Sequence, residues 1–281
     1  TDTLLGVENP MFAGWTVGGL GLDGTGFDDT FDVTLDDLQW MSIRGGAGQD
    51  TYTINVVPIA QTTQGLTLGN VTTGTLATPG QRVVHTFNLV SATQLYFDSL
   101  TNDPNIAWSL KGPRGKEVSS LRLDRSDSTD RIDATIDALA GDWTLTIQGS
   151  GDATGDFSFA LLDLLNSAHS TQITPNPGAG NPTVTITPTA GLEPLQTEAF
   201  RFTADAGDVF SFVTNVTGSI GSYYRIVDSN GTEVTPRTNL TTDRLNQVMS
   251  RGGDYLLLVE PRFNNTDVDD YSIDINFVQN N

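Results

Sequence analysis

Short runs in which apolar and polar residues alternate recur along most of this chain. They are rich in β-branched and aromatic residues, which favour strands. Clusters of Gly, Asn, Asp and Pro separate them at intervals of about 8–12 residues, a spacing typical of antiparallel β-sandwiches. Residues 161–165 begin a helical apolar period, but Asn166 and Ser167 interrupt it. The pattern predicts an all-β chain. The clearest runs are residues 83–89, 95–97, 143–147 and 157–161.

The pattern of the first half returns in the second half at a nearly constant spacing. Five landmarks keep their order, with offsets between 112 and 116 residues, which indicates an internal duplication. A segment rich in Pro and Gly, 167–182, lies between the two copies. We expect it to be a semi-rigid linker that keeps two sandwiches apart. The landmark pairs are 85–87 with 200–202, 95–97 with 209–212, 108–110 with 224–226, 141–145 with 253–257, and 157–159 with 271–273.

Both copies share turn and strand motifs near their ends. Each has a hairpin turn, at 112–115 in the first copy and at 228–231 in the second. Each then has a Gly-Asp-aromatic-x-Leu motif, which begins at Gly141 and at Gly253. These motifs resemble the bacterial pre-peptidase C-terminal (PPC) domain over most of each copy. The resemblance implies jelly-roll-like sandwiches that serve as accessory modules of secreted proteins, and some relatives bind calcium and a protein ligand.

A Gly-rich motif precedes the duplicated region. Residues 45–54 are Gly-Gly-Ala-Gly-Gln-Asp-Thr-Tyr-Thr-Ile. The glycines Gly45, Gly46 and Gly48 allow tight turns whose carbonyl groups face outward, and Asp50 adds a carboxylate. This is the nonapeptide pattern of parallel β-rolls, in which stacked turns offer oxygen ligands to Ca²⁺. The motif predicts a calcium site at these four residues, and a Gly-rich hairpin turn is the alternative.

Two earlier segments repeat parts of this motif. Asp29-Thr30-Phe31 lies 21 residues before Asp50-Thr51-Tyr52, and it follows a turn that contains Gly24, Gly26 and Asp28. Residues 2–9 form a third related segment. The three segments resemble repeats-in-toxin (RTX) proteins, which are secreted and fold with extracellular calcium. The resemblance implies a short, irregular β-roll with Asp28 and Asp29 as further candidate ligands for Ca²⁺.

These patterns predict four parts. They are a β-roll-like segment at 1–60, a first PPC-like sandwich at 61–166, the linker at 167–182 and a second PPC-like sandwich at 183–281. The chain begins at Thr1 inside what resembles a repeat, so we expect it to be a section of a longer protein.

Composition narrows the choice of partners. The 281 residues carry a formal net charge of −20, which disfavours nucleic acids and anionic membrane surfaces as partners. Asp outnumbers Glu by 28 to 6, and short carboxylates suit tight turns and cation-binding loops. An acidic surface that serves solubility explains the charge equally well. There is no Cys, which excludes disulfides and thiol chemistry, and no apolar run is long enough to span a membrane.

The sequence contains no recognisable catalytic motif. His85 lies inside an alternating run and His169 in the predicted linker, so the histidines lack metal-ligand spacing. No Gly-x-Ser-x-Gly motif occurs. Trp108 and Trp143 align with Tyr224 and Tyr255, which favours packing in the sandwiches over a sugar-binding platform. Loop aspartates are candidates for additional calcium sites, with solvated loops as the alternative. They are Asp98, Asp103, Asp152 and Asp156 in the first copy and Asp267, Asp269 and Asp270 in the second.

The sequence therefore predicts a non-enzymatic structural, adhesion or ligand-binding section of a large, secreted, calcium-dependent bacterial repeat protein, located outside the cell or at its surface. The alternative is an accessory region of a secreted peptidase or glycosidase that assists export, folding or substrate binding. Candidate partners are an extracellular protein, a glycan or neighbouring copies of the same chain.

Overall fold

The chain divides into two compact units in a computed structural model. The first unit contains residues 1–61 and the second contains residues 62–281. The structure describes residues 3–4, 19–23, 30–35, 40–44, 49, 51–56, 60–126, 135–175, 183–189, 195–217, 221–261 and 270–279.

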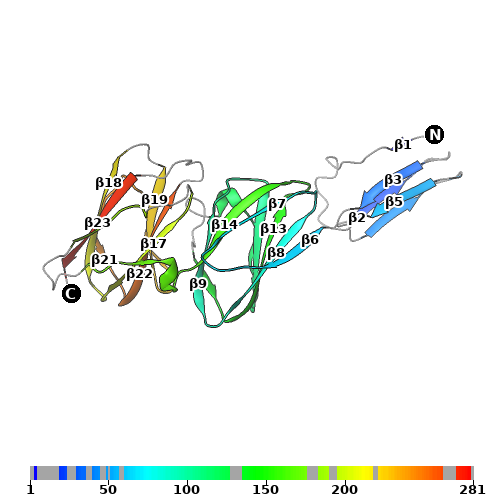
Figure 1. The fold of residues 1–281 in the computed structure, drawn as a ribbon. Coiled ribbons are helices and arrows are strands. Elements are labelled where there is room, and N and C mark those ends of the chain that lie inside the picture. The colour runs from blue at the N-terminus through cyan, green and yellow to red at the C-terminus, as the bar shows by residue number, and fades with distance from the viewer. Residues whose placement is uncertain are drawn as a thin grey trace. The chain divides into compact units, whose positions relative to one another are not determined.

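All described strand pairs of the first unit are parallel, and the strands belong to two sheets (Figure 1). One sheet contains β1 (Thr3–Leu4), β3 (Thr30–Leu35) and β5 (Thr51–Val56), and the other contains β2 (Gly19–Asp23) and β4 (Trp40–Arg44). Successive strands therefore alternate between the two sheets, which is the topology of a β-roll. The register places Thr3 opposite Thr30 and Thr30 opposite Thr51. The three related sequence segments are thus aligned in space as they are in sequence.

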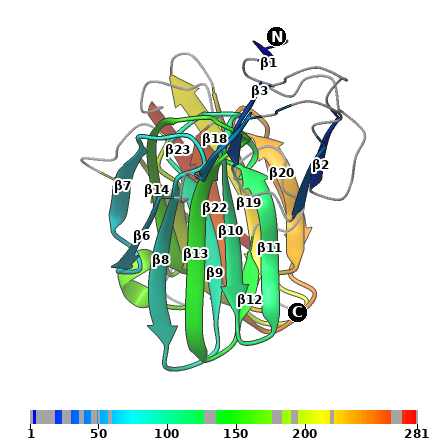
Figure 2. The same cartoon turned by 90° about the vertical axis from the view of Figure 1, so that its right-hand side faces the viewer.

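The first sandwich is made of two sheets in the described residues. The five-stranded sheet has the order β11-β10-β13-β8-β6, and Figure 2 looks onto it. The four-stranded sheet has the order β12-β9-β14-β7. A short 3-10 turn, η1 (Leu123–Arg125), follows β11. The strands are β6 (Gln61–Gly65), β7 (Val71–Leu76), β8 (Arg82–Leu89), β9 (Thr93–Ser99), β10 (Ile106–Gly112), β11 (Gly115–Arg122), β12 (Ile136–Ala138), β13 (Gly141–Gly149) and β14 (Gly155–Asp163).

The second sandwich repeats this topology strand for strand. Its sheets have the orders β20-β19-β22-β17-β15 and β21-β18-β23-β16, so each strand replaces the one nine places earlier. The repeated order is the structural form of the duplication inferred from the sequence. The strands are β15 (Thr171–Gln172), β16 (Thr183–Ile186), β17 (Glu198–Ala204), β18 (Val209–Thr217), β19 (Ser222–Asp228), β20 (Glu233–Asn239), β21 (Arg244–Val248), β22 (Gly253–Pro261) and β23 (Asp270–Gln279).

The prediction of an all-β chain with two antiparallel sandwiches is confirmed. Within the described parts of the chain, the only helical elements are η1 and η2 (Ser167–His169), and no helix has the length and apolarity needed to cross a membrane. Each sandwich buries its own apolar core between its two sheets. Equivalent aromatic pairs stack in the two cores, with ring centroids 6.2 Å apart for Phe87 and Trp143 and 5.6 Å apart for Phe202 and Tyr255.

The expectation that the linker keeps the two sandwiches apart is wrong. The first part of that segment is ordered, because β15 pairs with β17 and Ile173 enters the core of the second sandwich. Just before it, Asn166 caps η2 by accepting a hydrogen bond from the Ala168 N–H. A third apolar cluster then joins the two sandwiches directly. The physical reason is that the two facing sheets carry apolar side chains on their outer sides, and burying these stabilises contact.

His85 is fully buried in the first core and lies edge-on to Phe159 at 5.4 Å between ring centroids. Its Nδ1 lies 3.3 Å from Gln64 Nε2, while Nε2 has no hydrogen-bond partner among the described residues. Burial lowers the pKa of His85 because the charged imidazolium loses its hydration. The histidine is therefore a neutral core residue in the folded chain.

We expect His85 to make the first sandwich sensitive to acid. The unfolded chain binds a proton at His85 below the ordinary pKa of 6.5, whereas the folded chain resists it. The free energy of unfolding therefore decreases as the pH falls below 6.5, by at most about 1.4 kcal/mol per pH unit for one proton. His85→Leu should make urea-unfolding free energies flatter between pH 6.5 and 5. An unchanged slope in this variant would contradict the assignment.

Candidate functional site

The predicted calcium ligands lie outside the described residues. Gly45, Gly46, Gly48 and Asp50, together with Asp28 and Asp29, fall in the segments 24–29 and 45–48 and at position 50. The structure describes the strands that flank these segments, and their register bears on the site.

The two turn sequences connect equivalent strands. Residues 24–29 follow β2 and precede β3, and residues 45–50 follow β4 and precede β5. Asp23 at the end of β2 lies opposite Arg44 at the end of β4. Thr30 at the start of β3 lies opposite Thr51 at the start of β5. Two six-residue connections therefore leave and re-enter the sheets at neighbouring positions.

Among the residues that the structure describes, the aspartates proposed as ligands in the sandwich loops do not gather into a site. Asp267 and Asp269 lie outside the described residues, and no group of three or more His, Asp or Glu side chains suited to a metal occurs in the described parts of the chain. Asp156 accepts a hydrogen bond from Thr75 Oγ1 at 2.5 Å, and Asp103 accepts one from the Asn105 N–H at 2.7 Å. Asp98 lies in the contact between the sandwiches.

Several surface aspartates accept hydrogen bonds from threonine hydroxyl groups and not from lysines. On neighbouring strands, Thr Oγ1 donates to an Asp carboxylate on the solvent side of the sheet. Cross-strand hydrogen bonds of this kind stabilise a sheet without an opposite charge. They explain how an Asp-rich, Lys-poor surface tolerates its charge. The pairs are Thr75–Asp156 (2.5 Å), Thr185–Asp274 (2.5 Å), Thr203–Asp254 (3.0 Å) and Thr217–Asp270 (2.9 Å).

The most extensive buried arrangement outside the two cores is the contact between the sandwiches. The outer face of the sheet β12-β9-β14-β7 packs against the outer face of the sheet β15-β17-β22-β19-β20, and in Figure 1 strands β9 and β14 lie on the side of β17 and β22. Where they meet, the central strands of both sheets are therefore buried on two faces. The apolar part of the contact consists of Tyr96, Ala160, Leu162 and Leu164 from the first sandwich and Ala199, Val227, Leu256 and Leu258 from the second.

A buried ion pair lies inside this contact. Glu260 on β22 is fully buried, and one of its oxygens, Oε2, accepts hydrogen bonds from Arg225 Nε at 3.0 Å and Nη2 at 2.9 Å. The other oxygen accepts a hydrogen bond from the Tyr96 hydroxyl of the first sandwich at 2.8 Å. Burial raises the pKa of Glu260, while Arg225 and Tyr96 oppose that shift. Arg225 thus compensates a charge that would otherwise be buried alone.

Asp98 on β9 is the second fully buried carboxyl group in the contact. It accepts hydrogen bonds from the Thr197 backbone N–H at 3.1 and 3.2 Å and from Thr197 Oγ1 at 2.8 Å. Burial raises the pKa of Asp98 to about 7, and the negative charge of Glu260 adds to the rise, while the hydrogen bonds from Thr197 oppose it. This group therefore titrates near neutral pH.

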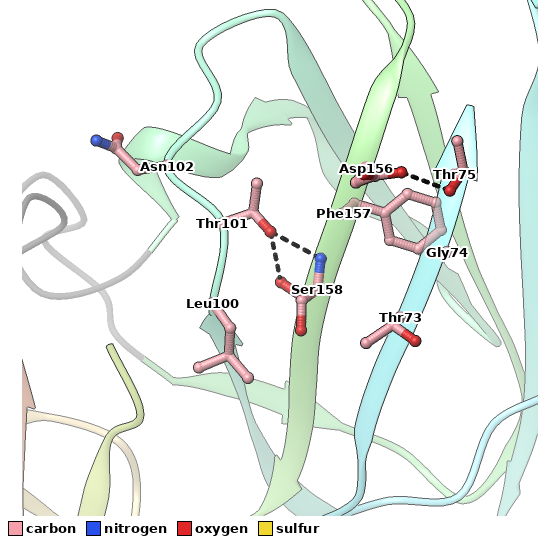
Figure 3. Close-up of a pocket in the computed structure, with 9 residues that line it drawn as sticks. All are labelled: Thr73, Gly74, Thr75, Leu100, Thr101, Asn102, Asp156, Phe157 and Ser158. Carbon is pink, nitrogen blue, oxygen red and sulfur yellow. Dashed lines mark hydrogen bonds between the residues drawn. The ribbon is translucent and has the colours of Figure 1, made fainter. Parts of the chain in front are cut away.

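An open groove of about 560 Å³ lies on the outer side of β7 and β14 (Figure 3). Hydroxyl groups dominate its polar lining: Thr75 is bonded to Asp156, and Thr101 Oγ1 accepts from the Ser158 N–H at 2.7 Å. Gly74 leaves room for the buried Phe157 ring, because a Cβ at this position would lie 2.4 Å from that ring. The groove offers hydrogen-bond partners to a polar ligand. Its other lining residues are Thr73, Leu100 and Asn102.

The preference for packing over sugar binding at the tryptophans is confirmed. Trp108 and Trp143 are 0% and 1% exposed, so neither ring face is available to a ligand. Trp108 stacks on Phe97 with ring centroids 3.9 Å apart, and its Nε1 donates to Ser126 Oγ at 2.7 Å.

Sequence reasoning missed the contact between the sandwiches, although a signal for it existed. Strands buried on both faces lose their apolar–polar alternation and become continuous apolar runs. Residues 255–259 and 159–162 are such runs, and the structure places them in β22 and β14. The equivalent strand β13 alternates, with Thr144 and Thr146 at the positions of Leu256 and Leu258.

Comparison with known proteins leaves the family open. No protein-family description and no curated protein matches the sequence. The Aeromonas hydrophila PliG, a periplasmic inhibitor of g-type lysozyme, aligns with 38% of this chain and 96% of its own at 13% identity and a TM-score of 0.32. The CUB1-EGF-CUB2 region of human MASP-1/3 aligns with 73% and 99% at 9% identity and a TM-score of 0.25. The secreted serine protease VesC from Vibrio cholerae aligns with 77% and 49% at 10% identity and a TM-score of 0.26. With TM-scores below 0.5, these similarities carry no argument about function.

Proposed function

We propose that this chain is a non-enzymatic structural and ligand-binding section of a secreted, calcium-dependent bacterial protein. In this proposal the N-terminal unit folds around Ca²⁺, and the two sandwiches that follow it in the chain pack together as one module. The observation that carries the proposal is the parallel, in-register pairing of β2 with β4 and of β3 with β5 on either side of the segments 24–29 and 45–50.

The chemistry of these segments supports calcium as the ligand. Asp29 and Asp50 each stand directly before a strand, and those two strands begin opposite one another at Thr30 and Thr51. Carboxylates that approach each other repel unless a cation lies between them. Oxygen-rich turns favour Ca²⁺ over transition metals. A calcium ion would thus stabilise the folded roll relative to the unfolded segment.

The two sandwiches fit the role of a module in which two domains pack against each other. The faces that meet are apolar, whereas equivalent faces at the two ends of the pair are polar. Asp274 and Asn276 stand at the positions that correspond to Ala160 and Leu162. Polar outer faces are typical of terminal repeats, which need solubility instead of a further neighbour. The groove beside Thr75 and Asp156 is the first place to look for a glycan or protein partner.

We expect calcium to stabilise the N-terminal unit and leave the sandwiches unaffected. For dissociation constants of 10⁻⁴–10⁻³ M, 10 mM Ca²⁺ would add roughly 1.4–2.7 kcal/mol to the stability of the unit that binds it. Isothermal titration calorimetry and hydrogen exchange at β3 and β5, with and without chelator, measure this effect.

Asp50→Asn should abolish most of the calcium response, and Asp142→Asn serves as the control because Asp142 is exposed and bonded to Asn88 at 2.7 Å. If calcium protects neither β3 nor β5, the calcium part of the proposal is wrong. Equal responses in the two variants would instead reject the N-terminal segments as the site.

A further inference from the structure

Among the described residues, the contact between the sandwiches contains two fully buried carboxyl groups, Asp98 and Glu260, but one buried cation, Arg225. We propose that protonation of Asp98 controls the docking of the two sandwiches: the neutral carboxyl group holds them together, and its ionisation weakens the contact so that they separate. The device is independent of calcium, because every group in it lies in the second compact unit.

The hydrogen bonds distribute the charges unequally. Glu260 takes both of the close contacts from Arg225 and the hydroxyl of Tyr96. Asp98 receives only the N–H and the hydroxyl of Thr197, which are neutral donors. Within the described parts of the chain, the ion pairs leave Asp98 without a cation. An ionised Asp98 would therefore be a buried, unbalanced charge, and such a charge is strongly unfavourable.

The surroundings of Asp98 add negative charge and no further positive charge. Glu260 on β22 is the charged group that acts on Asp98, Tyr96 lies two residues away on the same strand, and Arg225 on β19 is bonded to Glu260. Arg225 is already committed to Glu260, and its Nη1 also lies 4.0 Å from Glu233. Ala160, which is paired with Asp98, and Ala199 on β17 carry no charge. Arg201, two residues after Ala199, donates to the Leu164 carbonyl of the first sandwich, and no ion pair among the described residues joins it to Asp98.

Separation of the sandwiches removes the cost of burying an ionised Asp98, because Thr197 and Asp98 belong to different sandwiches. The bonds from Thr197 to Asp98 and from Tyr96 to Glu260 both cross the contact, as does the bond from Gln94 to the Ser229 carbonyl at 2.8 Å. Once the faces part, water hydrates both carboxylates. Docking therefore competes directly with the hydration of Asp98.

The direction of the pH effect follows from linkage. When the sandwiches are apart, the carboxyl group of Asp98 has its ordinary pKa of 3.8, and in the docked state the pKa is about 7. As far as Asp98 is concerned, the docking equilibrium constant is therefore largest below pH 3.8. It falls about tenfold per pH unit between pH 3.8 and pH 7, and it is constant above pH 7. Between pH 5 and pH 8 we expect the docking equilibrium constant to fall roughly a hundredfold.

The test is hydrogen exchange of the full chain at pH 5 and pH 8, corrected for intrinsic exchange rates. In the native sequence we expect the Thr197 amide, which donates to Asp98 across the contact, to lose protection strongly at pH 8, while protection in β10 and β18 changes little. Asp98→Asn keeps the size and the acceptor for Thr197 but cannot ionise. This variant should lose the pH dependence at the Thr197 amide, and a native-like dependence would overturn the proposal.

Two further variants separate titration of Asp98 from general weakening of the contact. Asp274→Asn changes a carboxylate on the solvent side that also accepts a threonine hydroxyl, from Thr185, so it should behave like the native chain. Thr197→Val removes the hydroxyl that favours the ionised form, so the midpoint of the transition should move to higher pH. A purely structural role for Thr197 would weaken docking at every pH without moving the midpoint. Carbon-13 NMR of the Asp98 carboxyl group gives the midpoint directly, and a value near 4 would reject the proposal.

Discussion

Arg225→Met should destabilise the docked pair of sandwiches by about 3–5 kcal/mol, because it leaves the fully buried Glu260 without its cation. Methionine fills much of the space of the arginine stem, so the loss reflects charge more than volume. The contact can respond by opening, which hydrates Glu260. We therefore expect urea unfolding to change from a single transition to two, as the sandwiches become independent.

The same substitution at a surface ion pair gives the matched control. Arg114 Nε lies 2.9 Å from Glu117 Oε1, but the Arg114 side chain is 48% exposed, so Arg114→Met should change stability little. A double variant, Arg225→Met with Glu260→Leu, removes both charges and should recover most of the loss. If Arg225→Met unfolds as cooperatively as the native chain, the pair does not hold the contact together.

Trp108→Ala should reduce the stability of the first sandwich by about 3–5 kcal/mol. The indole is fully buried, stacks on Phe97 and donates to Ser126, so its removal leaves a cavity and loses both contacts. Thermal or urea unfolding followed by near-ultraviolet circular dichroism measures the loss, because the stacked aromatic pair contributes to that signal.

Trp108→Phe separates packing from hydrogen bonding. It keeps an aromatic ring against Phe97 and loses the bond to Ser126, so the expected loss is about 1–3 kcal/mol. Val90→Ala is the control for a site without packing, because Val90 is 94% exposed. A Trp108→Ala variant as stable as Val90→Ala would mean that the core of the first sandwich is not organised around this residue.

Local pattern was sufficient for much of the fold. Alternation within residues 83–89 and 143–147 predicted strands that the structure has as β8 and β13, and the constant offset between the copies predicted two sandwiches of one topology. The Asp-Thr-aromatic segments predicted a roll, and the strands at Thr30 and Thr51 pair in the required register. Such features depend on neighbouring residues in the chain, so they are visible without a structure. Of the candidate sites, the sequence could name the calcium ligands from a motif, and these remain a prediction.

The sequence by itself determined the strands, the duplication and the candidate calcium motif, because each is written in short-range periodicity. Only the tertiary structure decided that the sandwiches pack together and that Asp98 and Glu260 enter the contact from opposite sides. The linker prolines suggested separation, yet the apolar outer faces of β14 and β22 outweigh them. The pKa of Asp98 depends on burial by a partner surface about a hundred residues away in the chain. Burial and charge pairing are sums over such distant neighbours, and no local pattern contains them.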